Sequence, residues 1–77
     1  MDAYIMEDNM QLLGVVALTE DIPAKGLRRG QVGTVVELLA PNVFEVEFSD
    51  DEGRAYAILP LRAEQLIVLH YQPTEVA

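Results

Sequence analysis

Hydrophobic and polar residues alternate most regularly in the segment VFEVEFS near the middle of the chain. Phe44, Val46 and Phe48 fall on one side of an extended chain, whereas Glu45 and Glu47 fall on the other. This period of two is typical of a strand with one buried side and one side that faces solvent. The pattern therefore predicts a strand whose three apolar side chains lie in the core.

Four further segments, rich in β-branched and aliphatic residues, predict more short strands separated by turn signals. The five predicted strands span residues 12–18, 32–39, 43–49, 54–59 and 66–71. Pro60 predicts the end of the fourth strand, because proline has no N–H to donate to a sheet. The segment LRAEQ, residues 61–65, is too short for a free-standing helix and predicts a 3₁₀ turn before the last strand.

The segments between the strands carry the residues that favour turns. Residues 19–31 predict a long loop punctuated by proline and glycine, and residues 40–42 (APN) predict a tight turn. Residues 50–53 (DDEG) predict a type I turn that closes a hairpin through a G1 bulge, with Gly53 in the left-handed region.

Five short strands in a flat sheet would expose two edges, and rolling the sheet into a partly closed barrel removes most of that exposure. A long loop after the first strand and a 3₁₀ turn before the last are the layout of SH3-like barrels. We therefore predict an all-β, five-stranded SH3-like barrel over residues 12–71, with a flexible N-terminal arm (residues 1–11) and a C-terminal tail (residues 72–77). An OB-fold ranks second, because it usually has a helix between its third and fourth strands.

The chain has 77 residues and no cysteine, which predicts one small domain without disulfides, thiolate zinc sites or a thiol nucleophile. No apolar run reaches the roughly 20 residues of a membrane-spanning helix. The first ten residues contain no basic side chain, so the positive region of a secretory signal is missing. These features predict a soluble, cytoplasmic protein.

Thirteen acidic residues against five basic ones give a formal net charge of −8. A surface of this sign repels nucleic acids and anionic membranes, so we expect neither as a partner. The hydrophobic fraction of 51% is high for a domain that buries only roughly 60% of the surface of its unfolded chain. This balance favours a protein partner or a homo-oligomer.

Lys25, Arg28 and Arg29 concentrate three of the five basic residues in the long loop. They have three interpretations. They solvate the loop, they neutralise the five acidic residues between positions 45 and 52, or they bind an acidic partner through the bidentate guanidinium groups. Surface ion pairs contribute only about 0–1 kcal/mol, which weakens the second interpretation as an argument for stability. Solvation ranks ahead of partner binding.

Gly30 and Gly33 lead into the second predicted strand rather than into a helix, and no GK[ST] follows them. A phosphate-binding loop needs that helix. Glycine inside a strand marks a bulge, a sharp bend or the close approach of another segment. We therefore interpret Gly33 as a residue that allows packing and curvature.

The chain offers little chemistry for catalysis. His70 is the only histidine and lies in an apolar segment, and Ser49 is the only serine and lies outside a GxSxG sequence. Glu45 and Glu47 lie on the side predicted to face solvent, which would not raise a carboxyl pKa. Residues 50–52 (DDE) lack the spacing and length of a calcium-binding loop. We predict no enzyme activity, no catalytic residues, no metal and no cofactor.

The segments GLRRGQVGTVVEL, FEVEFSDDEG and AILPLRAEQL, read together, resemble a family of small bacterial proteins classed as a domain of unknown function. The resemblance covers residues 12–69 and departs in detail, with Phe44 where tyrosine is expected. It implies an SH3-like barrel without an established activity. GQVGTVVEL is also similar to the core of KOW-type barrels, which bind RNA or polymerase. The strand pattern further resembles SH3-like accessory subunits of photosynthetic electron transport and of nitrile hydratase, an analogy of fold alone.

Two functions follow as hypotheses. The leading one is a non-catalytic protein-interaction module, such as an accessory or regulatory subunit or an acidic antitoxin or immunity-type protein that masks a basic site. The rival is a KOW-like module that binds RNA or the ribosome through Lys25, Arg28 and Arg29. The charge of −8 argues against the rival.

Overall fold

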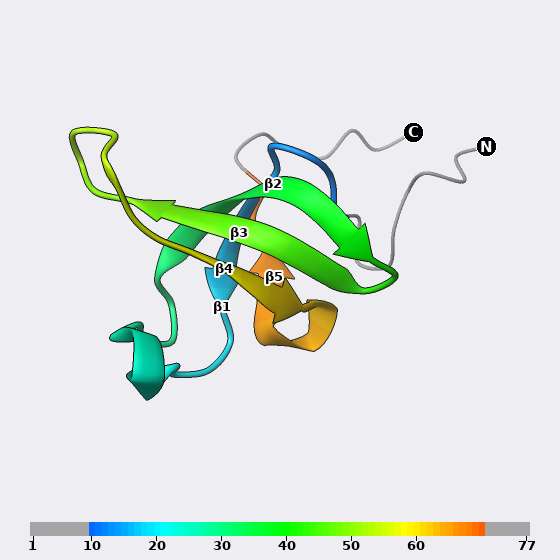
Figure 1. Ribbon diagram of the computed structural model, residues 1–77, viewed down its shortest axis with the longest axis horizontal. Coiled ribbons are helices and arrows are strands. Elements are labelled where there is room, and N and C mark those ends of the chain that lie inside the picture. Colours follow the sequence, from blue (N-terminus) through cyan, green and yellow to red (C-terminus); the bar gives the residue numbers. More distant parts are fainter. Residues whose placement is uncertain (1–9, 71–77) are drawn as a thin grey trace.

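A computed structural model describes residues 10–70 as one antiparallel sheet with two short 3₁₀ turns (Figure 1). The strands are β1 (Val15–Leu18), β2 (Val32–Ala40), β3 (Val43–Ser49), β4 (Ala55–Arg62) and β5 (Leu66–Val68). The 3₁₀ turns are η2 (Pro23–Lys25) and η3 (Ala63–Gln65). In space the strands follow the order β4-β3-β2-β1-β5. Residues 10–70 contain no helix long and apolar enough to cross a membrane.

The predicted all-β class is confirmed, with five strands and a 3₁₀ turn directly before the last one. The five strands form one open sheet around a single hydrophobic core, and β4 and β5 are its two edges. The first strand starts later than predicted, at Val15, because residues 11–14 form a turn. The last strand ends at Val68, and residues 71–77 of the predicted strand and tail lie outside the described residues.

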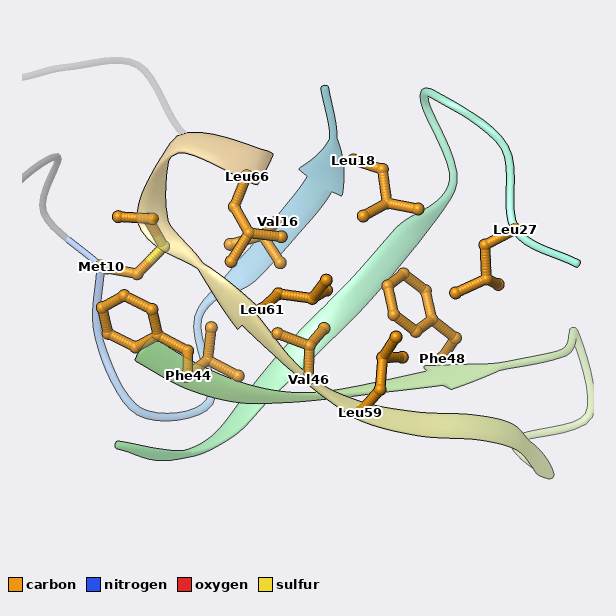
Figure 2. Close-up of a cluster of buried hydrophobic side chains, with 12 residues drawn as sticks. Met10, Val16, Leu18, Leu27, Phe44, Val46, Phe48, Leu59, Leu61 and Leu66 are labelled. Atoms are coloured by element: carbon orange, nitrogen blue, oxygen red, sulfur yellow. The ribbon is translucent and has the colours of Figure 1, made fainter. Parts of the chain in front are cut away.

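The core lies where the alternation of β3 predicts it. Phe44, Val46 and Phe48 are at most 2% exposed, and they point inward together with side chains of the other four strands (Figure 2). Their main partners are Val16, Leu18, Leu27, Val35, Leu59, Leu61 and Leu66. The predicted arm contributes as well, because Met10 is 1% exposed and lies beside Phe44. Residues 1–9 of that arm lie outside the described residues.

Strand β2 bends strongly enough to pair with two neighbours around the core. Its register with β3 shifts between Val35 and Glu37 and again between Leu38 and Ala40, which leaves Val36 and Leu39 as extra residues. Such bulges increase the local twist and bend the strand. These two bulges therefore contribute to the curvature of the sheet.

Pro60 does not end the fourth strand, contrary to the prediction, because β4 continues through it to Arg62. The N–H of Ala63 donates to the carbonyl of Asn42 (2.9 Å), which fixes the alternation of hydrogen bonds along β4. Along an antiparallel strand the N–H groups point alternately toward and away from the neighbouring strand. Pro60 pairs with Glu45 and lies an odd number of residues, three, before Ala63, so an N–H at position 60 would point away from β3. Proline is tolerated there because β4 is an edge strand.

The predicted hairpin turn between β3 and β4 is confirmed. Gly53 has φ +83° and donates its N–H to the carbonyl of Asp50 (2.9 Å), while Asp50 donates to the carbonyl of Arg54 (2.9 Å). The carboxylate of Asp50 also accepts hydrogen bonds from the N–H groups of Glu52 and Arg54. The side chain and the backbone of Asp50 therefore both stabilise this turn through hydrogen bonds.

Candidate functional site

The long loop that carries the basic residues is an ordered scaffold. Ile22 and Leu27 form an isolated antiparallel bridge, with N–H to carbonyl distances of 2.8 and 3.1 Å, across the η2 turn. Leu27 is 2% exposed and packs into the core, which ties the loop to the barrel. Gly26 and Gly30 both have positive φ, a conformation that glycine adopts without strain.

Lys25, Arg28 and Arg29 project from this scaffold into solvent. The N–H of Arg28 donates to Oε1 of Gln31, and the N–H of Arg29 donates to Oδ1 of Asp21 (2.8 Å), so the backbone at both arginines is fixed. None of the ion pairs between residues 10–70 involves these three side chains. Within residues 10–70 the base that pairs with the acidic residues of the hairpin turn is Arg54, which contacts Asp50 and Glu52.

Gln31 connects the basic loop to β4. Its Oε1 accepts from Arg28, and its Nε2 donates to the hydroxyl of Tyr56 (2.9 Å), which is 52% exposed. Beside the loop lies a shallow hollow of about 260 Å³, lined by Asp21, Pro23, Gly26, Leu27 and Arg28. Guanidinium groups can bind an anionic group, and an exposed aromatic ring can stack with a base.

A second charged surface lies on the outer side of the sheet, and we call it the carboxylate face: Glu37, Glu45 and Glu47. Glu45 lies directly opposite Glu37 across the β2–β3 ladder, and Glu47 lies opposite Ile58 on β4. Like charges opposite each other destabilise a sheet. None of the ion pairs within the described part of the chain includes these three carboxylates. The sheet therefore keeps an unfavourable group of negative charges on one side.

The acidic residues with a shifted pKa, Asp50 and Glu64, lie outside the carboxylate face. Hydrogen bonding from the backbone N–H of Arg54 lowers the pKa of Asp50, and the hydrogen bond from the Arg62 side chain lowers the pKa of Glu64. Both carboxylates are exposed and stabilise turns. In residues 10–70 no polar or charged side chain is buried, and no group of three His, Asp or Glu residues could hold a metal ion.

The structure places His70 and Ser49, the two residues that the sequence analysis considered for catalysis, on the surface. His70 is exposed and borders a hollow of about 290 Å³ whose other walls are largely apolar, formed by Met10, Gln11, Gly14, Val15, Val16, Val68 and Leu69. Ser49 is exposed at the end of β3. Ser49 lines neither the hollow beside His70 nor the hollow beside the basic loop.

Sequence reasoning missed two members of these surfaces. Glu37 faces Glu45 only because Val36 is an extra residue in β2, and no pattern in the sequence signals that bulge. Tyr56 reaches the basic loop through Gln31, 25 positions away. If the second and third strands are paired outward from the APN turn without bulges, Glu37 falls near Glu45. This pairing does not tell whether the two side chains lie on the same side of the sheet.

Comparisons with curated proteins and with solved structures give no match. A family does match, over residues 12–68, which is nearly the stretch for which the sequence motifs predicted a resemblance. That match confirms the predicted kinship with proteins of uncharacterised role, and the chain belongs to the family described as a domain of unknown function, DUF4926.

Proposed function

We propose that this chain is a non-catalytic protein-interaction module of the bacterial cytoplasm, an accessory or regulatory subunit or an antitoxin- or immunity-type protein. It works without a cofactor and binds a basic protein partner through the carboxylate face. The observation that carries this proposal is the pair of Glu37 and Glu45, held directly opposite each other with Glu47 two positions further along β3.

The arrangement is unfavourable for the isolated barrel and favourable for a complex. Cβ atoms of directly opposite residues lie about 4.5–5.5 Å apart, so the two carboxylates repel each other unless a cation lies between them. A partner's lysine or arginine would remove this repulsion and gain charge-assisted hydrogen bonds. The net charge of −8 would also accelerate the encounter with a basic surface and reject acidic partners.

Native affinity capture with the full chain as bait tests the proposal. We expect a stoichiometric protein partner that dissociates as salt rises, because the contact is electrostatic. The triple variant Glu37→Gln/Glu45→Gln/Glu47→Gln should lose it. The variant Lys25→Gln/Arg28→Gln/Arg29→Gln, which changes three charges of the opposite sign, should keep it. A strictly monomeric chain without any stoichiometric protein partner contradicts the proposal.

The second candidate function is a KOW-like module that binds RNA or the ribosome through Lys25, Arg28 and Arg29. The specific observation in its favour is the hydrogen bond from Gln31 to the hydroxyl of the exposed Tyr56, which links this aromatic residue to the loop that carries the cations. A base stacked on an aromatic ring contributes about 1–3 kcal/mol, and the cations would contact phosphates.

A fluorescent 15-nucleotide single-stranded RNA, titrated at low salt, separates the two functions. The RNA-binding module requires measurable affinity that falls steeply with salt and is lost in the Lys25→Gln/Arg28→Gln/Arg29→Gln variant. The absence of binding at low salt eliminates this candidate and leaves the protein-interaction module.

A further inference from the structure

A tight turn at residues 11–14 presents two leucines to solvent. The N–H of Gly14 donates to the carbonyl of Gln11 (2.9 Å), so Leu12 and Leu13 occupy the two central positions of the turn. Leu12 is 62% exposed and Leu13 is 72% exposed, the largest values among the big apolar side chains of residues 10–70. We call these two residues, Leu12 and Leu13, the leucine turn.

Leu13 has a backbone conformation that suits other residues better. Its φ is +65°, in the left-handed region, where Cβ crowds the backbone. The other described residues with positive φ are glycines or an asparagine: Gly26, Gly30, Asn42 and Gly53. A turn of this kind normally has glycine or asparagine at the position of Leu13. The leucine therefore destabilises the turn locally and gains no burial within the described chain.

The leucine turn is nevertheless held rigidly. The N–H of Leu13 donates to the carbonyl of Val35 (2.6 Å), and the N–H of Val35 donates to the carbonyl of Gly14 (2.9 Å). The preceding residue Met10 is anchored in the core. A rigid apolar projection loses little conformational freedom when a partner covers it, which favours binding.

The leucine turn lies close to the carboxylate face. Figure 1 shows the turn, in blue, against β2, and its hydrogen-bond partner Val35 is two residues from Glu37, about 7 Å along a strand. Glu37 lies opposite Glu45. Two arrangements that the isolated chain does not favour, an exposed strained leucine and a facing pair of carboxylates, thus adjoin the same short stretch of β2, one on its β1 side and one on its β3 side.

We propose that the leucine turn is the apolar anchor of the interface, and that the partner is a protein with an apolar pocket bordered by lysine or arginine. This inference rests on the proposed function and adds the second half of the contact. Charge complementarity selects the occupant: the cations around the pocket pair with Glu37 and Glu45 while the pocket encloses Leu13. A second copy of this chain fits poorly, because two copies with a charge of −8 each repel each other.

The test uses a phage-displayed library of random 16-residue peptides selected on the immobilised full chain at low salt. We expect enriched peptides that combine large apolar residues with flanking lysine or arginine. A synthetic peptide of the selected sequence is then titrated by fluorescence anisotropy. Leu13→Asn should weaken its binding at least tenfold and raise the midpoint of thermal unfolding by about 2–6 °C, because asparagine tolerates the left-handed conformation. Ile67→Asn is the matched control, since Ile67 is 54% exposed on β5, and it should bind the peptide unchanged.

Several results would overturn the inference. No enrichment, or enrichment of acidic peptides, refutes the proposed partner chemistry. A lower unfolding midpoint of Leu13→Asn shows that the chain itself covers Leu13. A dimer in sedimentation equilibrium that dissociates in Leu13→Asn assigns the leucine turn to a second copy. Should Leu13→Asn bind like the wild type while Glu37→Gln/Glu45→Gln does not, the leucine turn is refuted and the proposed function stands. When the native capture described above also yields no partner, both fail.

Discussion

Replacing Gly33 by alanine adds one methyl group at the most crowded of the five glycines. A Cβ atom at this position would lie 2.7 Å from Cγ1 of Val46, 2.9 Å from Cε2 of Phe48 and 3.0 Å from the carbonyl oxygen of Glu47. Ordinary contacts between carbon atoms are about 3.5–4.0 Å. Val46 and Phe48 are fully buried and have no solvent to move into. The strands β2 and β3 must therefore separate locally.

The magnitude follows from these contacts. Forcing an extra methyl group into a packed core typically costs about 1–3 kcal/mol. The loss of glycine's freedom in the unfolded chain offsets about 0.4–1 kcal/mol. We expect Gly33→Ala to lower the free energy of unfolding by about 1–2 kcal/mol, a substantial part of the roughly 4–11 kcal/mol typical of 77 residues. The corresponding fall in the unfolding midpoint is about 4–16 °C.

Urea unfolding followed by circular dichroism measures the change, and a double-mutant cycle with Val46→Ala identifies its cause. Removing Cγ1 of Val46 relieves the shortest of the three contacts, so Gly33→Ala should cost less in that background than in the wild type. A Gly33→Ala protein as stable as the wild type would refute the reasoning, as would an equal cost in both backgrounds.

Three other predictions concern the surface. The folded state lowers the pKa of Asp50 below its ordinary value of 3.8, so the stability that its carboxylate contributes is present above that pH and is lost as the pH falls through the folded-state pKa. Asp50→Asn should therefore lower the urea midpoint at pH 7, and the difference from the wild type should shrink as the pH falls below 3.8 and through the lower folded-state pKa. Pro60→Thr should destabilise the monomer by only roughly 0.5–1 kcal/mol, because the new N–H points away from β3, but sedimentation should show self-association through the opened edge of β4. Glu37→Gln should raise the free energy of unfolding by roughly 0.2–0.5 kcal/mol at low salt, because it removes the repulsion from Glu45. This gain should shrink in roughly molar salt, where charges are screened.

The parts of the fold that the sequence predicted are those that local patterns determine. Phe44, Val46 and Phe48 alternate with glutamates, so only the apolar side of this strand can be buried. The glycine at position 53 directly after DDE restricts the hairpin to the few turn types that place a glycine at positive φ. Gly33 was interpreted as a packing residue because a strand rarely has another use for glycine, and the short distances around it confirm this interpretation.

The remaining features depend on neighbours that the sequence does not reveal. Pro60 is compatible with β4 only because the strand is an edge and the alternation of its hydrogen bonds leaves position 60 unpaired. Met10 lies in a segment without periodicity, and it is buried in a core whose other members, such as Phe44, lie far away in the sequence. The candidate surfaces show the same division: Lys25, Arg28 and Arg29 are visible as a run of like charge, whereas the opposition of Glu37 and Glu45 requires the bulge at Val36.

The position of β5 at one edge of the sheet determines where the fold opens first. This strand has three residues and pairs only with β1, through contacts such as Val16 with Val68, which are about fifty positions apart in sequence. The ladders β2–β3 and β3–β4 join neighbours in sequence and close short loops, so they form readily and first. Amide hydrogens of β5 and of the β1 positions facing it should therefore exchange with solvent well before those of β3. Fluctuations of the native state would expose the β1 edge while the three-stranded meander stays intact.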